Sequence, residues 1–138
     1  MFCDLPARGD DAAAYILHRG EAAYVVMNLY PYNPGHVMVV PFDHVQDLAS
    51  LDDALATEMI RLAQRTERVL SDALRPHGFN LGVNIGRAGG AGIADHLHMH
   101  LVPRWTADTN FLTALADTRV IPLGLDEAYA QLAKGFAT

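Results

Sequence analysis

The amino-acid sequence predicts an α+β fold: an antiparallel five-stranded sheet, covered on one face by one long helix, with a short helix near the C-terminus. Three observations support this prediction. Short apolar segments bounded by turn residues recur along the chain, as expected for β-strands. A single long segment between them has apolar residues at helical spacing. The 138 residues are a suitable length for one domain, which we assign to residues 1–138.

The first three strands are expected at residues 14–18, 23–28 and 36–40. Arg19-Gly20 predicts a tight turn between the first two, which makes them antiparallel. Two prolines and a glycine at residues 30–35 indicate a loop before the third strand.

The long helix is expected from Leu51 to about Arg75. Ser50 is the predicted N-cap, with Asp53 at the capping-box position. The apolar residues that follow lie on one helical face: Leu55, Met59, Leu62, Val69 and Leu70.

The second half of the chain predicts strands at residues 79–85 and 95–102, the latter ended by Pro103. A glycine-rich loop at residues 86–92 separates them. Asp126 is expected to cap a short helix that runs to about Lys134.

Composition restricts the classes of partner. The formal net charge of −6 argues against a nucleic acid polymer as ligand, so an anionic ligand should be a small molecule. The single cysteine, Cys3, excludes an internal disulfide and fits a reducing compartment. Without a long apolar run or a basic leader, we expect a cytoplasmic protein that does not bind membranes.

Three histidines alternate with apolar residues in the predicted strand 95–102. Because successive side chains of a strand point to opposite faces, His96, His98 and His100 should share one face. Leu97, Met99 and Leu101 should then face the helix. The imidazoles must be reachable by water or a ligand.

Three interpretations of these histidines are open. They can be solvent-facing residues of an amphipathic strand, although three histidines within five residues are rare. They can bind a metal, but a span of about 13 Å prevents all three from converging on one ion. They can also perform nucleophilic catalysis, in which the middle imidazole attacks phosphorus and its neighbours orient it.

The run His-x-His-x-His resembles the signature of the histidine triad (HIT) family. Further matches extend over residues 14–105: Asn28, Pro34-Gly35-His36, Val39-Val40-Pro41, His44 and Asn84-x-Gly86. The tail from Val102 to Phe111 resembles a bacterial branch that includes diadenosine tetraphosphate phosphorylases and is related to the fragile histidine triad hydrolases.

This resemblance implies a role for each histidine. His98 matches the nucleophile that becomes bound to the nucleoside monophosphate. His100 matches the residue that contacts the phosphate and assists the leaving group. His96 and His36 match the outer members of the cluster. Asn28 matches the ribose-binding residue.

The remaining nucleotide-binding candidates are Asn84, Gly90, Ala91, Gly92 and Trp105. The glycine loop is expected to hold phosphates through its backbone N–H groups. Many relatives have a glutamine or serine near Gly92, so the absence of a side chain there leaves the leaving-group preference open. Trp105 is expected either to stack on the base or to pack in the core.

No metal is expected to be required for the reaction, although Mg²⁺ can accompany a polyphosphate substrate. Many bacterial relatives have a Cys-x-x-Cys zinc pair completed by histidines. Here only Cys3 and His44 match, because the chain starts at Met1. We therefore expect an incomplete ligand set and no structural zinc.

The resemblance implies a hydrolase or transferase that acts at the α-phosphate of an adenine nucleotide, such as a dinucleoside polyphosphate. A nucleotidyl group on His98 is the expected intermediate, and a homodimer is the expected assembly. Two alternatives remain: a nucleoside phosphoramidase, and a nucleotide-binding module with little turnover.

Overall fold

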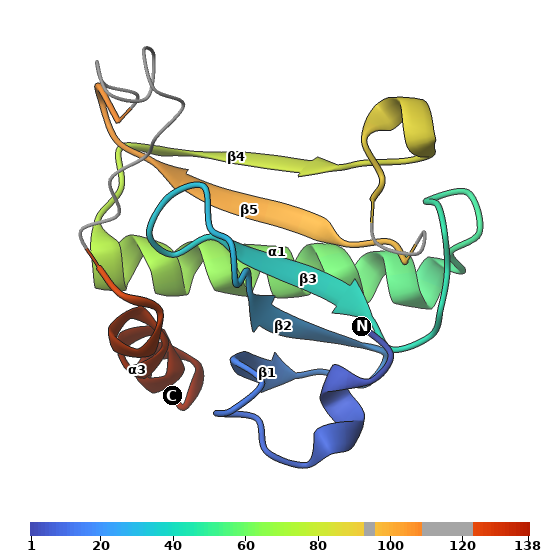
Figure 1. Ribbon diagram of the computed structural model, residues 1–138, viewed down its shortest axis with the longest axis horizontal. Helices are drawn as coiled ribbons and strands as arrows, with labels where there is room; N and C mark the ends of the chain where they lie inside the picture. Colours follow the sequence, from blue (N-terminus) through green and yellow to red (C-terminus); the bar gives the residue numbers. More distant parts are fainter. Residues whose placement is uncertain (93–95, 109–122) are drawn as a thin grey trace.

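The computed structural model describes residues 1–92, 96–108 and 123–138 and has the predicted α+β architecture (Figure 1). Its elements are, in chain order, η1 (Leu5–Arg8), β1 (Ile16–Arg19), β2 (Ala23–Met27), β3 (Val37–Pro41), α1 (Asp53–Leu74), β4 (Gly78–Val83), η2 (Arg87–Gly89), β5 (Met99–Arg104) and α3 (Leu125–Phe136). The five strands form one sheet in the order β1-β2-β3-β5-β4, and every neighbouring pair is antiparallel.

Helix α1 crosses one face of the sheet, as its spacing predicts (Figure 1). Its apolar stripe packs on side chains from β2, β3 and β5, and this cluster forms the main core. Leu97 and Leu101 lie in this core and Met99 packs against it, which confirms the predicted direction of the apolar side chains. The histidines therefore lie toward the other face.

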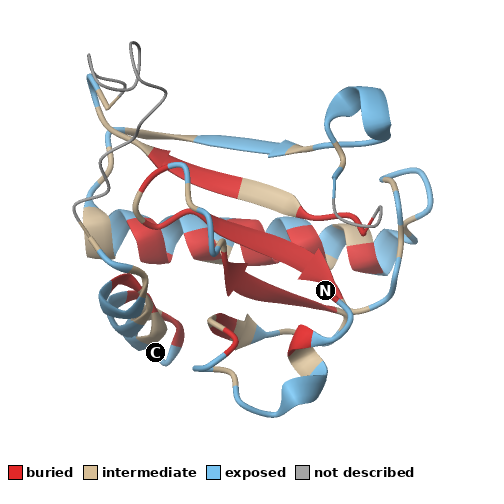
Figure 2. Cartoon of the chain, viewed as in Figure 1, coloured by how far each residue is buried: buried red, intermediate tan, exposed pale blue. Residues whose placement is uncertain are grey.

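That other face is also covered, over part of its area. Phe2 and Leu5 of the N-terminal segment pack on Tyr24, Val26 and Met38 in a second buried cluster. All residues of β2 and β3 are therefore buried, whereas much of the edge strand β4 is exposed (Figure 2). The prediction of a sheet covered on one face only is therefore wrong. The continuous apolar runs of β2 and β3 are the signal in the sequence that fits burial on both faces.

Both predicted helix caps are corrected by the structure. The N-cap of α1 is Asp52, whose carboxylate accepts from the N–H of Leu55. Ser50 instead donates its N–H and hydroxyl to Asp47. Gly124 precedes α3, and Asp126 lies in its first turn, where it accepts from the Tyr15 hydroxyl.

Strand β5 starts later and ends later than predicted. His96 and His98 precede it, because the N–H of Leu97 donates to Val45 in the loop after β3 and so lies outside the ladder. Asp95, the predicted first residue, lies outside the described residues.

Pro103 does not end β5 as predicted, and the strand continues to Arg104. The carbonyl of Arg104 accepts from His77 on the β4 side, so the nitrogen of Pro103 faces the β3 side. On that side β3 begins only at Val37, opposite Leu101, so no residue of β3 is paired with Pro103. The missing N–H therefore removes no hydrogen bond from the sheet.

Among the described residues, no helix combines the length and the apolar character needed to cross a membrane.

Candidate active site

A cleft of about 340 Å³ opens where the start of β5 meets three loops and the N-terminal segment. It contains most of the predicted site residues: Asn28, Asn84, Gly90, Gly92, His98 and His100. The other walls come from the N-terminal residues and from three tyrosines, Tyr15, Tyr30 and Tyr32. The cleft is thus lined mostly by apolar and aromatic side chains, with the histidines and asparagines among its polar groups.

Four predicted site residues do not line this cleft. His36 lies behind His100, and His96 turns toward Cys3. Ala91 faces a separate hollow beside Gln46. Trp105 is half-buried, and its backbone N–H donates to Asp108.

His36 and His100 form a directly hydrogen-bonded pair whose orientation follows from the backbone. The N–H of Tyr32 donates to Nδ1 of His36 at 3.1 Å, so neutral His36 carries its proton on Nε2. That Nε2–H donates to Nδ1 of His100, 2.8 Å away. Neutral His100 must then carry its proton on Nε2, where it can donate to a ligand in the cleft.

Both imidazoles of this pair are neutral at neutral pH. Burial lowers the pKa of His36 to about 3, and the neighbouring His100 and His98 act in the same direction. Burial also lowers the pKa of His100 to about 4, with a smaller contribution from His98. A neutral His100 can therefore donate a hydrogen bond from Nε2 to a developing oxyanion.

His98 is oriented by its own backbone. Its Nδ1 lies 2.8 Å from the carbonyl oxygen of His96, which can only accept, so Nδ1 carries the proton. The lone pair is therefore on Nε2. The ring lies between two others, with centroids 4.8 Å from His100 and 5.0 Å from Phe2.

Asn28 lies beside the histidine pair at the end of β2. Its Oδ1 accepts from the N–H of Tyr30, which fixes the amide. Its Nδ2 is 3.4 Å from Nε2 of His36. The Nδ2 group is therefore the part of Asn28 that can donate to a ligand.

The glycine loop differs from the expected cradle of backbone amides. The N–H groups of Gly89, Gly90 and Ala91 donate to carbonyls of Gly86 and Arg87 within the loop. Gly90 has φ +91, and a Cβ there would lie 3.6 Å from Nδ2 of Asn84. Of the predicted loop residues Gly90, Ala91 and Gly92, the first two therefore use their amides within the loop, and the side chain of Asn84 is a donor that lines the cleft here.

The loop that carries Tyr32 and His36 is fixed to the end of β5. Asn33 donates to the carbonyl of Pro103 and to Asp108, each at 2.8 Å. Arg104 pairs with the same carboxylate, and its hydrogen bonds hold the pKa of Asp108 well below its usual range. These contacts fix the loop that carries His36 relative to β5, and so fix His36 relative to His100.

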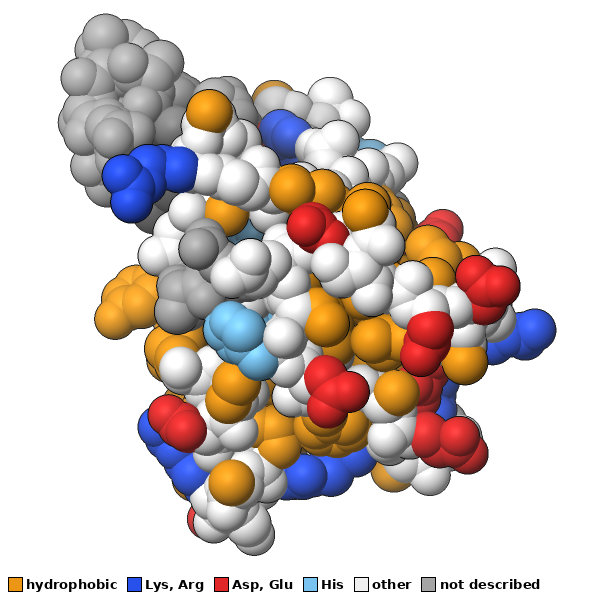
Figure 3. Space-filling view, turned by 90° about the vertical axis from the view of Figure 1, so that its right-hand side faces the viewer, with side chains coloured by type: hydrophobic (Ala, Val, Ile, Leu, Met, Phe, Trp, Pro, Cys, Tyr) orange, Lys and Arg blue, Asp and Glu red, His pale blue; other side chains and the backbone are white. Residues whose placement is uncertain are grey.

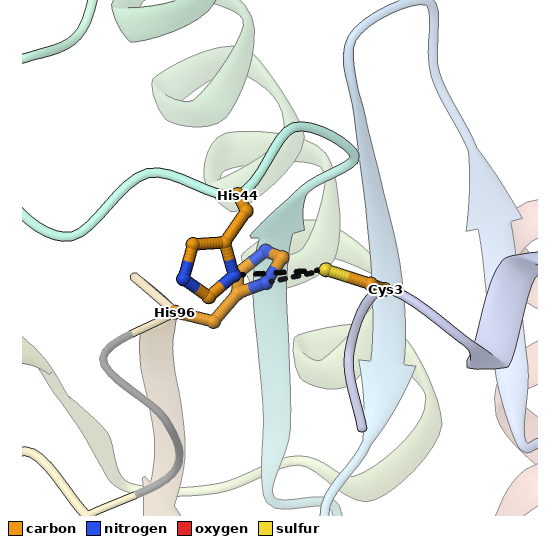
Figure 4. Close-up of side chains that lie close together, drawn as sticks. All are labelled: Cys3, His44 and His96. Atoms are coloured by element: carbon orange, nitrogen blue, oxygen red, sulfur yellow. Dashed lines mark hydrogen bonds between the residues drawn. The ribbon is translucent and has the colours of Figure 1, made fainter.

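His96 belongs to a second cluster, next to the cleft. Sγ of Cys3 lies 3.6 Å from Nδ1 of His44 and 3.4 Å from Nδ1 of His96, and one ligand atom of each residue lies within 4.8 Å of the other two (Figure 4). Figure 4 shows that the three residues come from separate segments: the N-terminus, the loop after β3 and the approach to β5. Cys3 and His44 are exposed, and histidine is visible at the surface on the side drawn in Figure 3.

The donors of this cluster fit a zinc ion. Nε2 of His96 lies 2.9 Å from the carbonyl of Pro41, so it carries the proton and leaves the lone pair on Nδ1, facing the sulfur. A backbone carbonyl behind a histidine is the usual support of a metal-ligating imidazole. One sulfur and two imidazole nitrogens are preferred ligands of Zn²⁺. The sequence predicted Cys3 and His44 for this cluster, whereas His96 was predicted as part of the catalytic histidine cluster.

Sequence reasoning also missed Phe2 and Tyr32. Phe2 contacts residues more than 90 positions away in the chain, and no periodic pattern marks it. Tyr32 acts through its backbone N–H, which every residue except proline has.

The HIT domain family model matches residues 11–107. The chain is 43% identical over 136 residues to "AP-4-A phosphorylase" of Mycobacterium tuberculosis, covering 99% of this chain and 69% of the relative. It is 28% identical over 93 residues to "Bis(5'-nucleosyl)-tetraphosphatase [asymmetrical]" of Schizosaccharomyces pombe, covering 67% and 50% of the two chains. The crystal structure of a Zn-bound histidine triad family protein from Mycobacterium smegmatis superposes with a TM-score of 0.79 and 25% identity, over 99% of this chain and 91% of the other.

Proposed function

Because the chain belongs to the HIT domain family, we propose that it is an enzyme that cleaves a dinucleoside polyphosphate at an α-phosphorus, with His98 as the nucleophile. One observation carries the proposal. His98 lies in the cleft with its lone pair on Nε2, next to a neutral His100 that carries a proton on its own Nε2. The names of the M. tuberculosis and S. pombe relatives support this class of substrate.

The first step forms a nucleotidyl–histidine intermediate. Nε2 of His98 attacks the α-phosphorus, and the bond between that phosphorus and the bridging oxygen breaks. The Nε2–H of His100 donates a hydrogen bond to the departing oxygen, which leaves as a polyphosphate anion. The Nδ1–H bond to the His96 carbonyl stabilises the positive charge that the His98 ring acquires.

The second step releases the nucleotide. Phosphate or water attacks the phosphorus, the bond to Nε2 of His98 breaks, and the proton lost by the attacking group passes to solvent. The Nε2–H of His100 again donates to a phosphoryl oxygen. Asn28 binds the ribose through its Nδ2 group, and Asn84 donates to the phosphates from the end of the glycine loop. The apolar and aromatic side chains of the cleft hold the base. None of these steps requires a metal, and Mg²⁺ enters only with a polyphosphate substrate.

We expect phosphate to act as the acceptor, since the M. tuberculosis relative is named as a phosphorylase. Diadenosine tetraphosphate with phosphate then gives ADP and ATP, whereas reaction with water gives AMP and ATP. Product analysis with and without millimolar phosphate distinguishes them, and ADP should be the main product when phosphate is present.

Other outcomes of this assay favour the alternatives. Production of AMP at the same rate with and without phosphate indicates a hydrolase. Preferential cleavage of adenosine phosphoramidate indicates a phosphoramidase. Tight AMP binding without turnover of any of these substrates indicates a nucleotide-binding module and contradicts the proposal.

We also propose a cytoplasmic homodimer. A single cysteine fits a reducing compartment, where nucleotides are abundant. Strand β4 is an edge of the sheet, and it and the residues after it leave Leu81 and Ile85 half exposed. A second copy would cover this edge and its apolar side chains.

The dimer is tested with Leu81→Lys. Light scattering should give twice the monomer mass for the wild type and a shift toward the monomer for the variant, because a charge replaces a buried apolar contact. Ile60→Lys, at an exposed apolar residue of α1 away from this edge, is the matched control. A monomeric wild-type protein at micromolar concentration contradicts this assembly.

A further inference from the structure

The N-terminal segment contacts the candidate nucleophile through one aromatic residue. The Phe2 side chain is only 1% exposed. Its ring centroid lies 5.0 Å from that of His98, at an interplanar angle of 43°, and 5.6 Å from that of His96. Since His100 contacts another part of the His98 ring, Phe2 and His100 together restrict its rotation.

Phe2 is itself held in place by the sheet. The hydroxyl of Tyr24, a fully buried residue of β2, donates to the carbonyl of Phe2 at 2.7 Å. Tyr24 in turn packs against the ring of Phe42. The backbone at Phe2 thus has one fixed point in the protein core.

The next residue along the chain is Cys3, which belongs to the cluster with His44 and His96. A metal ion there would give the same segment a second fixed point. It would also hold His96, whose carbonyl accepts the Nδ1–H of His98. The cluster and the nucleophile are therefore connected twice, through the Phe2 ring and through the His96 backbone.

We propose that Phe2 is a positioning residue for the His98 ring, and that a zinc ion bound by Cys3, His44 and His96 stabilises this position and so raises the rate of nucleotidyl transfer. The proposal rests on the proposed role of His98. The zinc ion takes no part in the reaction. The ion restricts the motion of the N-terminal segment, and the segment restricts the rotation of the His98 ring.

The expected effect is on the rate constant. Misalignment of a nucleophile by a fraction of an ångström to 1 Å costs up to about 100-fold in rate. Phe2→Leu keeps the site apolar and leaves a smaller, flexible contact. We expect it to lower kcat for diadenosine tetraphosphate about tenfold, with KM changed by less than about threefold.

Phe136→Leu is the matched control. It shortens a buried aromatic residue of the main core that does not line the cleft. It should change kcat by less than about twofold, in keeping with a purely structural role. An equal loss of kcat in the two variants, or no loss in Phe2→Leu, would overturn the positioning role.

The metal is tested directly with Co²⁺ and Zn²⁺ on metal-free protein. Co²⁺ should produce a thiolate-to-metal absorption band in the wild type that is missing in Cys3→Ser. Zn²⁺ should raise kcat of the wild type and should raise kcat of Phe2→Leu less, because only the connection through the His96 backbone remains there, although Phe2→Leu still binds the ion. Failure to bind Zn²⁺, or an equal stimulation of Phe2→Leu, would overturn the coupling.

Nuclear magnetic resonance of the histidine ring nitrogens separates this inference from the proposed function, because it does not require turnover. Zn²⁺ should change the ring signals of His98 in the wild type and leave them unchanged in Cys3→Ser. Unchanged signals in the wild type contradict the coupling. A fully active His98→Ala protein contradicts the proposed function instead, whatever the ring signals are.

Discussion

Replacement of His98 by alanine is expected to lower kcat/KM for diadenosine tetraphosphate by at least about 1,000-fold. The described part of the cleft has one imidazole with its lone pair on Nε2, that of His98, whereas His100 carries its proton there. Without His98, His100 and the binding contacts remain, but no covalent intermediate can form. The measurement is initial rate against substrate concentration, with phosphate present.

Two comparisons make this result specific. His98→Asn keeps a polar side chain and should be equally inactive, whereas His77→Ala removes an exposed histidine outside the cleft and should stay within about twofold of the wild type. Wild-type protein quenched during turnover of labelled substrate should retain acid-labile label that the His98 variants lack. Full activity of His98→Ala would exclude His98 as the nucleophile.

Acidification from pH 7 to pH 4 is expected to lower the free energy of unfolding by about 3 kcal/mol through His36 alone. The pKa of this buried imidazole falls from 6.5 to about 3 in the folded protein. Below pH 6.5 the unfolded chain therefore binds a proton that the folded protein does not bind. Stability is fully present above pH 6.5 and decreases progressively as the pH falls toward 3.

Urea unfolding at several pH values measures this effect. His36→Gln is the control: it is expected to be less stable at pH 7, and its stability should change less between pH 7 and pH 4. For each protein, the free energy of unfolding plotted against pH gives a slope. The difference between the wild-type and His36→Gln slopes separates the contribution of His36 from that of other titrating groups, such as Asp108, whose depressed pKa acts in the same direction. Equal slopes would mean that His36 is not held neutral by its surroundings.

The order of the elements and the identity of the cleft could be predicted from the sequence, because both depend on local patterns. Alternation placed Leu97 and Leu101 in the core, and it placed the histidines toward the other face. The family resemblance added Asn28 and His36, which no periodic pattern would have brought beside His100.

Details that depend on competition between neighbours could not be predicted. Ser50, Asp52 and Asp53 all have side chains suited to capping a helix, and only the three-dimensional path of the chain selects Asp52. The amides of the glycine loop had a partner within the loop, at the carbonyl of Gly86. His96 was expected in the cleft, yet the hydrogen bond from its Nε2 to Pro41 turns it toward Cys3.

The hydrogen bond from the Tyr32 backbone to His36 has a consequence for how this site can vary. The proton positions on His36 and His100 are both determined by a peptide group, so the direction of proton donation is independent of the side chain at position 32. Nineteen of the twenty amino acids at position 32 would keep the backbone N–H that fixes this direction. Proline alone would remove the donor and allow both rings to adopt the opposite tautomer. The tyrosine ring is thus free to change with the substrate, while the polarity of the histidine pair stays the same.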